Sequence, residues 1–505
     1  MFPRPSPRLL VLALAAALSG CSDSESPTGP DPTPSGPPVI ESFFATASGG
    51  TITHGDFTQL RWRATGGTTS SISDGTANVG GLPAVNEGSL SVRPYRTVTY
   101  TLTVRNGEGV ATATADVAVT YPSATFVDAV NGDDTRSGDS PDTAIKTLTE
   151  AVARAQGSGG FIFLSGGDFP TNVTMNGASI SIYGGLNPTT FFEEPETYQS
   201  VIRPSSGIPV EVSNVTQLVE FRHVLIDAQN GGAVAVAIDN APVDITYCTI
   251  DGDHAAEGTA VRITGERPVT IRRSRIFGGR EAGPATYPVT SGVRITGAPV
   301  TVSNCFVDGG KAVDESSGID VDNPPGVGVG VGLCTILAEA RGTIGSPSGA
   351  CVRVRQGHPA IGGNILVGAG TGDRVGVAEM GPGANPDWLE RNLYVGMGVP
   401  PYRNGDGPDP VTEGQLNDAA YTNGNSLQVW DNILLSGVAA SALFVNLGAL
   451  DFHLVPFLPS FEPNPAVDAG EVYLAQPRYG DVGHDIDGDP RPTSGALLDL
   501  GADEL

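Results

Sequence analysis

The chain has 505 residues, including 68 glycines and 40 prolines, and its formal net charge is −27. The glycine and proline content argues against long helices, and the negative field argues against nucleic acid or anionic membrane surfaces as partners. The length allows two or three domains.

Residues 1–20 have the features of a bacterial secretory signal. Arg4 and Arg8 precede an apolar run, Leu9 to Leu18, that is too short to span a bilayer comfortably. Leu18-Ser19-Gly20-Cys21 resembles the bacterial lipobox, which implies cleavage before Cys21, lipidation of its thiol and anchoring in the cell envelope. Ser22 after the cysteine implies delivery to the outer membrane or cell surface. The alternative is a plain secretory signal with a chance cysteine.

Two segments of different composition follow the signal. Residues 21–38 are rich in Ser, Pro and Gly and predict an extended tether. Residues 39–121 contain short alternating strands with glycine turns, which favour an antiparallel β-sandwich. The Trp62 strand, the Tyr100 strand (TYTLTV) and the following Asn-Gly-Glu-Gly resemble bacterial Ig-like modules. This resemblance implies a spacer domain in which Trp62 and Tyr100 are core residues.

Residues 122–160 predict a lead-in segment with a capping helix. Their motifs Gly132-Asp133-Asp134 and Gly138-Asp139-Ser140-Pro141 resemble the start of many bacterial β-helix proteins of the pectate-lyase-like class. We expect a helix from Thr147 to Gln156, with Thr147 and Glu150 forming a capping box. Such a helix would cover the open first coil and prevent edge-to-edge association.

One four-position pattern, with mostly apolar residues at offsets −5, −3, 0 and +2, recurs eight times between residues 219 and 434, the last three times less completely. The third position is taken successively by Val224, Cys248, Ser274, Cys305, Cys334, Asn364, Asn392 and Asn432. Each pair of positions two apart predicts a short strand with one buried face, and the gap between pairs predicts a bend. A unit of this size must bury its apolar face on neighbouring copies. Residues 161–448 are therefore predicted to form a right-handed parallel β-helix, which makes the fold class all-β.

Cysteines and asparagines share this third position. Export permits disulfides, and Cys305 and Cys334 are predicted on adjacent coils. Stacked parallel side chains rarely meet disulfide geometry, so buried free thiols are favoured for these residues and for Cys248 and Cys351. The three asparagines of the column predict an internal amide ladder.

Residues 449–505 depart from the repeat and predict a C-terminal cap. The series begins with Leu450-Asp451-Phe452-His453-Leu454 and continues with Asn464-Pro465-Ala466-Val467-Asp468-Ala469-Gly470 and Asp485-Ile486-Asp487-Gly488-Asp489-Pro490-Arg491-Pro492. Together with the final Asp-Leu-Gly-Ala-Asp-Glu, it resembles the C-terminal region of surface β-helix proteins of the choice-of-anchor Q type. The cap is what that resemblance implies.

Carboxylates that follow the last apolar residue of a repeat are the first binding candidates. Asp227 and Asp251 are predicted to stack, with Phe277 next in their column, and Asp253 and His254 extend the site into a loop. Such a cluster could protonate a glycosidic oxygen or hold Ca²⁺ as a cofactor. Alternatively, each Asp caps its own turn through the backbone. The familiar lyase and polygalacturonase motifs are incomplete.

Arginines on equivalent strands are the second candidates. Arg262, Arg294 and Arg353 recur at one position, with Asp320 in the intervening coil. An outward row of this kind could grip a uronate chain, or it could be solvated charge that compensates itself.

The leading hypothesis is a non-catalytic, lipid-anchored envelope protein whose β-helix binds a glycan or another cell-surface component. The first alternative is a polysaccharide lyase or glycoside hydrolase of the same fold that uses Ca²⁺ as a cofactor. A structural surface-coat component is the second.

Overall fold

The computed structural model describes residues 36–54, 56–75, 86–94, 96–121, 124–157, 159–228, 233–252, 255, 257–279, 287–340, 349–370, 373–398, 400–422, 428–446, 451–460, 463–467, 469, 485–487 and 499–502. Cys21, Asp253, His254 and Leu427 lie outside these ranges. The chain divides into two compact units, of which the first ends at residue 118 and the second contains 119–505 together with 53–55. None of the described helices is long and apolar enough to cross a bilayer.

The first unit contains antiparallel sheets. One has the order β1 (Val39–Ala45), β3 (Thr58–Thr65), β5 (Glu87–Val92), and the other has the order β2 (Thr51–Thr53), β7 (Gly109–Thr120), β6 (Val98–Asn106), β4 (Thr69–Ser73). Burial alternates along β3, so that Leu60, Trp62 and Ala64 point inward. Tyr100 of β6 is 3% exposed, and burial raises its pKa to about 12. The prediction that Trp62 and Tyr100 are core residues is confirmed.

The second unit contains the predicted helix as α1 (Leu148–Ala155), after β8 (Ala124–Val127) and the 3₁₀ turn η2 (Pro141–Thr143). Thr147 is its N-cap, with its hydroxyl accepting a hydrogen bond from the N–H of Glu150. In a complete capping box the Glu150 carboxylate would accept the backbone N–H of Thr147. Here that carboxylate pairs with Arg154 at 2.8 Å. Asp134 accepts the N–H of Thr147 instead, at 2.9 Å. The capping box is therefore confirmed in one half only.

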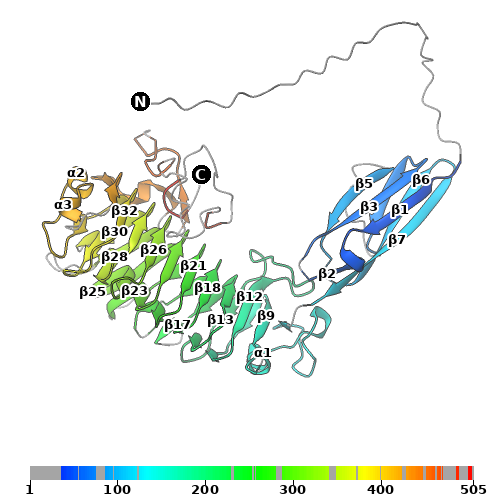
Figure 1. Ribbon diagram of the computed structural model, residues 1–505, viewed down its shortest axis with the longest axis horizontal. Coiled ribbons are helices and arrows are strands. Elements are labelled where there is room, and N and C mark those ends of the chain that lie inside the picture. The colour runs from blue at the N-terminus through cyan, green and yellow to red at the C-terminus, as the bar shows by residue number, and fades with distance from the viewer. Residues whose placement is uncertain are drawn as a thin grey trace, which may run out of the picture. The chain divides into compact units, whose positions relative to one another are not determined.

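The rest of the unit is built from parallel strands stacked in three columns, A, B and C (Figure 1). Column A is the 11-stranded sheet of β8, β9 (Gly160–Ser165), β12 (Ile180–Leu186), β15 (Val219–Arg222), β18 (Val243–Thr246), β21 (Val269–Arg272), β24 (Val300–Ser303), β26 (Val329–Gly332), β29 (Ala360–Gly362), β32 (Trp388–Glu390) and β35 (Gln428–Trp430). Its pairing starts at Ala124, earlier in the chain than the first coil predicted at Phe161.

The 18-stranded sheet contains the other two columns. Column B comprises β10 (Gly167–Phe169), β13 (Ser200–Ile202), β16 (Val224–Asp227), β19 (Thr249–Asp251), β22 (Arg275–Phe277), the first part of β25 (Phe306–Asp322), β27 (Thr335–Ala340), β30 (Ile365–Gly370), β33 (Leu393–Val395) and β36 (Ile433–Leu435). Column C comprises β11 (Val173–Asn176), β14 (Val210–Ser213), β17 (Val234–Asp239), β20 (Thr259–Thr264), β23 (Tyr287–Thr296), the second part of β25, β28 (Gly349–Gln356), β31 (Arg374–Glu379) and β34 (Tyr402–Arg403).

Hydrogen bonds between neighbouring coils place the predicted marker residues one above another. The N–H of Arg275 donates to the carbonyl of Cys248 at 2.9 Å, and that of Phe306 donates to Ser274 at 3.0 Å. The column B strands that follow these markers pair in parallel, as do those of columns A and C. The stacked parallel architecture predicted from the repeat is confirmed, and the second unit has a parallel β-helix-like fold.

Among the described residues, the interior of the stack is largely apolar, with its recurring polar groups in the marker column. One core cluster runs from Val127 and the buried face of α1 through the stacked coils to Leu416. Cys248, Cys305, Cys334 and Cys351 are all buried free thiols. Burial raises the pKa of Cys248 to about 12, so its thiol stays protonated and packs as a small apolar group.

The asparagines of the marker column form the predicted ladder. The amide of Asn364 donates to Oδ1 of Asn392 at 2.9 Å, and the amide of Asn392 donates to Oδ1 of Asn432 at 3.1 Å. Each amide also donates to a backbone carbonyl, which for Asn392 is that of Ile361 at 3.0 Å. All three side chains are buried, so these bonds satisfy polar groups that water does not reach.

Two short helices, α2 (Glu413–Leu416) and α3 (Ala419–Thr422), precede β35 of the last coil, and η3 (Ala440–Ala442), β37 (Phe444–Asn446) and β38 (Asp451–Leu454) follow that coil. Ala466 and Leu500 pack with Phe306 and Leu337 on the outer face of column B, and the N–H of Gly501 donates to the carbonyl of Gly363 at 2.9 Å. The described pieces of 449–505 thus cover a side face, which differs from the predicted end cap.

Candidate functional site

From β15 onward, the turn from column A into column B is made by a single residue in the left-handed region. The non-glycine members, with φ between 48° and 56°, are His223, Tyr247, Arg273, Asn304, Leu333, Arg391 and Asp431. This conformation costs a residue with a side chain about 1 kcal/mol. The cost is offset because the corner N–H bonds to the next coil, as from Tyr247 to the carbonyl of Arg272 at 3.4 Å. The corner side chains therefore follow one another along an edge of the stack.

The first three of these corner residues form a polar aromatic column. The rings of His223 and Tyr247 are stacked, with centroids 4.8 Å apart and planes within 8°. The guanidinium groups of Arg222 and Arg273 lie over the Tyr247 ring, at 5.6 Å and 5.4 Å from its centroid. Arg273 also donates to the Tyr247 hydroxyl at 3.1 Å. These contacts hold the Tyr247 ring from several sides.

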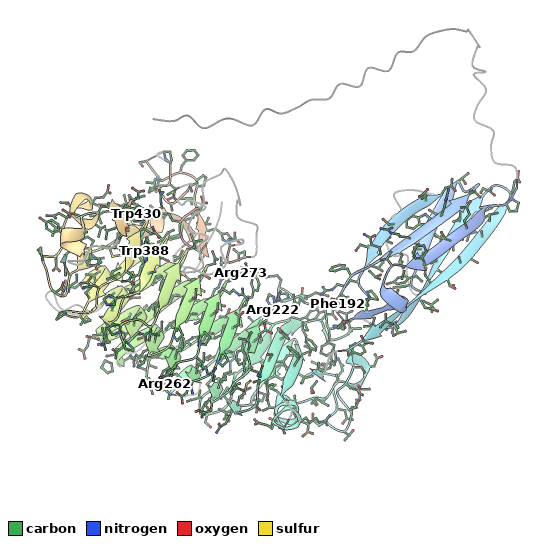
Figure 2. The ribbon with its side chains drawn as sticks, in the orientation of Figure 1. Phe192, Arg222, Arg262, Arg273, Trp388 and Trp430 are labelled. Carbon is green, nitrogen blue, oxygen red and sulfur yellow. The ribbon has the colours of Figure 1, made fainter. Side chains whose placement is uncertain are left out.

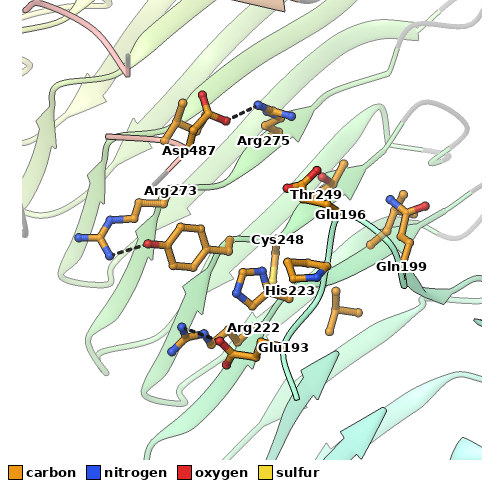
Figure 3. A pocket seen from close by; sticks show the side chains of 15 residues that line it. Glu193, Glu196, Gln199, Arg222, His223, Cys248, Thr249, Arg273, Arg275 and Asp487 are labelled. Atoms are coloured by element: carbon orange, nitrogen blue, oxygen red, sulfur yellow. Dashed lines mark hydrogen bonds and ion pairs between the residues drawn. The ribbon is translucent and has the colours of Figure 1, made fainter. Parts of the chain in front are cut away.

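A cleft of about 460 Å³ opens beside this column (Figure 3). One wall is the segment that contains Glu193, which pairs with Arg222 at 3.3 Å. The other wall includes Asp487 of the C-terminal region, which pairs with Arg275 at 3.1 Å. We call this cleft the corner groove, and define it by Glu193, Glu196, Gln199, Arg222, His223, Tyr247, Thr249, Arg273, Arg275 and Asp487.

His223 contributes a neutral imidazole to the corner groove. Burial lowers its pKa to about 4, and the nearby Arg222 acts in the same direction, while Glu193 opposes them. At neutral pH the ring therefore has one nitrogen that donates and one that accepts. Around it, guanidinium donors alternate with carboxylate acceptors and with hydroxyl and amide groups. This mixture matches a ligand whose groups both donate and accept, as sugar hydroxyls do.

The predicted carboxylate pair lies on another part of the stack. Asp227 and Asp251 are partners on adjacent coils, and Phe277 follows them, as predicted. Asp227 is 9% exposed and accepts a hydrogen bond of 2.7 Å from Arg203, which raises the pKa of that guanidinium. The column therefore exists, but Asp227 is already neutralised by a neighbour.

The predicted arginine row also exists, in column C. Figure 2 shows Arg262 of this row on the other side of the stack from Arg222 and Arg273 of the corner groove. Arg262 pairs with Glu257 at 2.7 Å, and Arg294 lies 3.7 Å from Asp320. These pairs support the interpretation of self-compensating charge. Arg353 occupies the outward position that the row predicts, but its side chain is fully buried and pairs with Glu315 at 3.0 Å, so it is not solvated.

No three described His, Cys, Asp or Glu side chains are grouped as a metal site requires. The Ca²⁺ hypothesis therefore has no cluster to rest on within the described ranges. Asp253 and His254, which it also invoked, lie outside them.

Sequence reasoning missed the corner groove, although the repeat contained its signal. Each corner residue directly precedes a marker position, so His223, Tyr247 and Arg273 come before Val224, Cys248 and Ser274. If the residues one position before each marker are aligned as a separate column, the sequence predicts that a histidine, a tyrosine and an arginine lie next to one another. Arg222 and Glu193 required the structure, because they come from a strand end and a distant loop.

A second polar feature is buried inside the last coils. Glu379 is 2% exposed, accepts from the hydroxyl of Tyr402, and accepts from the N–H of Gly405 at 3.0 Å. Burial raises the pKa of Glu379 to about 7, and the charges of Asp406 and Asp409 act in the same direction. Its carboxyl group is enclosed, so we assign it to the stability of the fold.

Comparison of the chain with protein-family models and with curated protein sequences finds no match.

Proposed function

We propose that this protein is a lipid-anchored component of a bacterial envelope that binds a glycan in the corner groove without converting it. The observation that carries the proposal is the stacked His223–Tyr247 pair, flanked by Arg222 and Arg273, beside a cleft of about 460 Å³. Side chains held rigidly before binding lose little entropy when a ligand arrives, which favours affinity.

The envelope location rests on the sequence. The lipobox at Cys21 supplies the anchor and residues 21–38 supply the tether. Residues 39–121 act as an Ig-like spacer, in keeping with their antiparallel sheets, and hold out the right-handed β-helix. The α1 helix, whose apolar face joins the core beside Ile162, closes the first coil.

Binding is favoured over catalysis because two of the groove's three acids are paired with arginines. Glu193 pairs with Arg222 and Asp487 pairs with Arg275, which suits ligand orientation better than proton transfer. The enzyme alternative keeps one supporting observation, namely that three carboxylates (Glu193, Glu196 and Asp487) line the same cleft.

The test is a screen of the full chain against an immobilised polysaccharide panel, with reducing-end and unsaturated-product assays run on the same panel. We expect saturable binding to a defined glycan, weakened about 30-fold by Tyr247→Ala, since buried aromatic anchors contribute most to such interfaces. Arg262→Ala is the matched control, because it removes an arginine that is one-third exposed on another column and should leave affinity unchanged.

Product formation that Glu196→Gln or Asp251→Ala abolishes would refute the non-catalytic proposal and favour a hydrolase or lyase. Absence of binding to any glycan would favour the structural-coat alternative. Equal losses of affinity in Tyr247→Ala and Arg262→Ala would indicate that the glycan does not bind in the corner groove.

A further inference from the structure

A second cleft, of about 520 Å³, opens at the turns that lead into β9, β12 and β15 of column A. We call it the first-coil cleft, and define it by Gln156, Gly157, Phe161, Asn176, Gln217 and Leu218. None of the described residues that line it is charged, although the chain has 55 acidic residues and 28 lysines and arginines. A ligand in this cleft is therefore recognised without ion pairs.

One wall of the first-coil cleft is an aromatic ring that its neighbours hold in place. The rings of Phe161 and Tyr183 are stacked, with centroids 5.7 Å apart and an angle of 14° between their planes. Tyr183 stacks in turn on Phe163, and its hydroxyl donates to Glu220 at 2.6 Å. Phe161 is only half-buried, so part of its apolar surface is left for a ligand. The C–H faces of sugar rings gain by packing on such a surface.

Amide side chains supply polar groups around this ring. Asn176 and Gln217 are exposed, and each offers two N–H donors and one carbonyl acceptor. The amide of Gln156 donates to the carbonyl of Thr174 at 2.7 Å, which holds the side chain and leaves its oxygen to accept. Sugar hydroxyls both donate and accept, so they match these groups. Leu218, which is 53% exposed, adds apolar surface to the same cleft.

The first-coil cleft has room for a ligand much larger than water. Its volume falls in the range of about 300–1,000 Å³ that is typical of small-molecule sites. A Cβ atom added at Gly157 or at Gly177 would meet no other atom within 4 Å. The two glycines therefore border open space rather than packed side chains.

We infer that the first-coil cleft is a second glycan site of this protein, and that it takes uncharged sugar residues. The half-buried aromatic ring and the exposed amides suit the faces and the hydroxyls of a sugar. A uronate or a sulfated sugar would find no cation among the described residues of the lining. A sugar as ligand is in keeping with the proposed function, but the first-coil cleft shares no residue with the corner groove, so each site can fail without the other.

The test is isothermal titration calorimetry of the full chain with uncharged hexasaccharides of glucose, mannose and xylose, and with hexagalacturonate as the charged comparison. We expect at least one uncharged hexasaccharide to bind, with the same affinity at low and high ionic strength, because no ion pair contributes. Phe161→Ala should weaken this binding about 10-fold, since the apolar contact with the ring is lost. Gly157→Trp should abolish it, because a bulky side chain at this open position fills the cleft.

Phe57→Ala is the matched control, because it removes an aromatic ring that is 68% exposed in the first unit and should leave the affinity unchanged. Gly157→Trp keeps the test valid where Phe161→Ala fails to fold. Binding that is lost in Tyr247→Ala and retained in Gly157→Trp would overturn this inference and leave the proposed function standing. Full affinity in both Phe161→Ala and Gly157→Trp, tighter binding of hexagalacturonate that Gly157→Trp abolishes, or no binding of any uncharged hexasaccharide would also overturn it.

Discussion

Asn392→Ala is expected to lower the free energy of unfolding of the C-terminal coils by about 4 kcal/mol, because buried polar groups would be left without partners. Oδ1 of Asn392 accepts from the backbone N–H and the amide of Asn364, at 3.2 Å and 2.9 Å. Its amide donates to Asn432 and to the carbonyl of Ile361. The substitution removes all four bonds from a place that water does not reach.

The measurement is native-state hydrogen exchange, since stacked coils open locally and one global transition would average over them. Cys305→Ala is the matched control in the same column, where loss of one buried sulfur should cost about 1 kcal/mol. Cys305 is as deeply buried as Asn392, so burial alone predicts similar costs for the two variants. Equal destabilisation would show that the amide ladder contributes nothing beyond packing.

Glu379→Gln is expected to stabilise the protein at pH 8 by about 3 kcal/mol and to leave it nearly unchanged at pH 4. Burial raises the pKa of Glu379 to about 7 from its ordinary value of 4.5. Between those values the folded protein keeps a proton that the unfolded chain has released. The stabilising contribution is therefore complete below pH 4.5, declines as the pH rises, and is lost above pH 7.

Urea unfolding between pH 4 and pH 8 measures this difference. Glu266→Gln is the control, because it neutralises an exposed carboxylate in the same unit and should not alter the pH profile. If Glu379→Gln and the unaltered protein show parallel profiles, the buried carboxyl group does not titrate as its surroundings require.

The repeat alone was sufficient to predict the stack, because its offsets fix which residues face inward. Apolar residues two apart define each strand, and the interval between the two pairs contains the corner. The ladder from Asn364 to Asn432 and the partners Asp227 and Asp251 followed from the same register. These features depend on local periodicity and on coil-to-coil equivalence, both of which a sequence records.

Depth and long-range contacts were not predictable in this way. Arg353 occupies an outward position of its strand, yet its side chain is fully buried among charged neighbours from other coils. Asp487 reaches the corner groove from a segment 212 residues after its partner Arg275. Side-chain burial and contacts with a segment distant in sequence leave no periodic pattern in the sequence. The candidate site was therefore identified only from the structure.

Hydroxyl-radical footprinting of the protein with and without the glycan selected by the screen tests the central claim most directly. The account predicts that bound glycan lowers the oxidation of Tyr247 and His223, which lie on adjacent coils, and spares Trp388 and Trp430 on later coils of column A (Figure 2). Unchanged oxidation of Tyr247 and His223 at saturating glycan, with protection elsewhere, would contradict it.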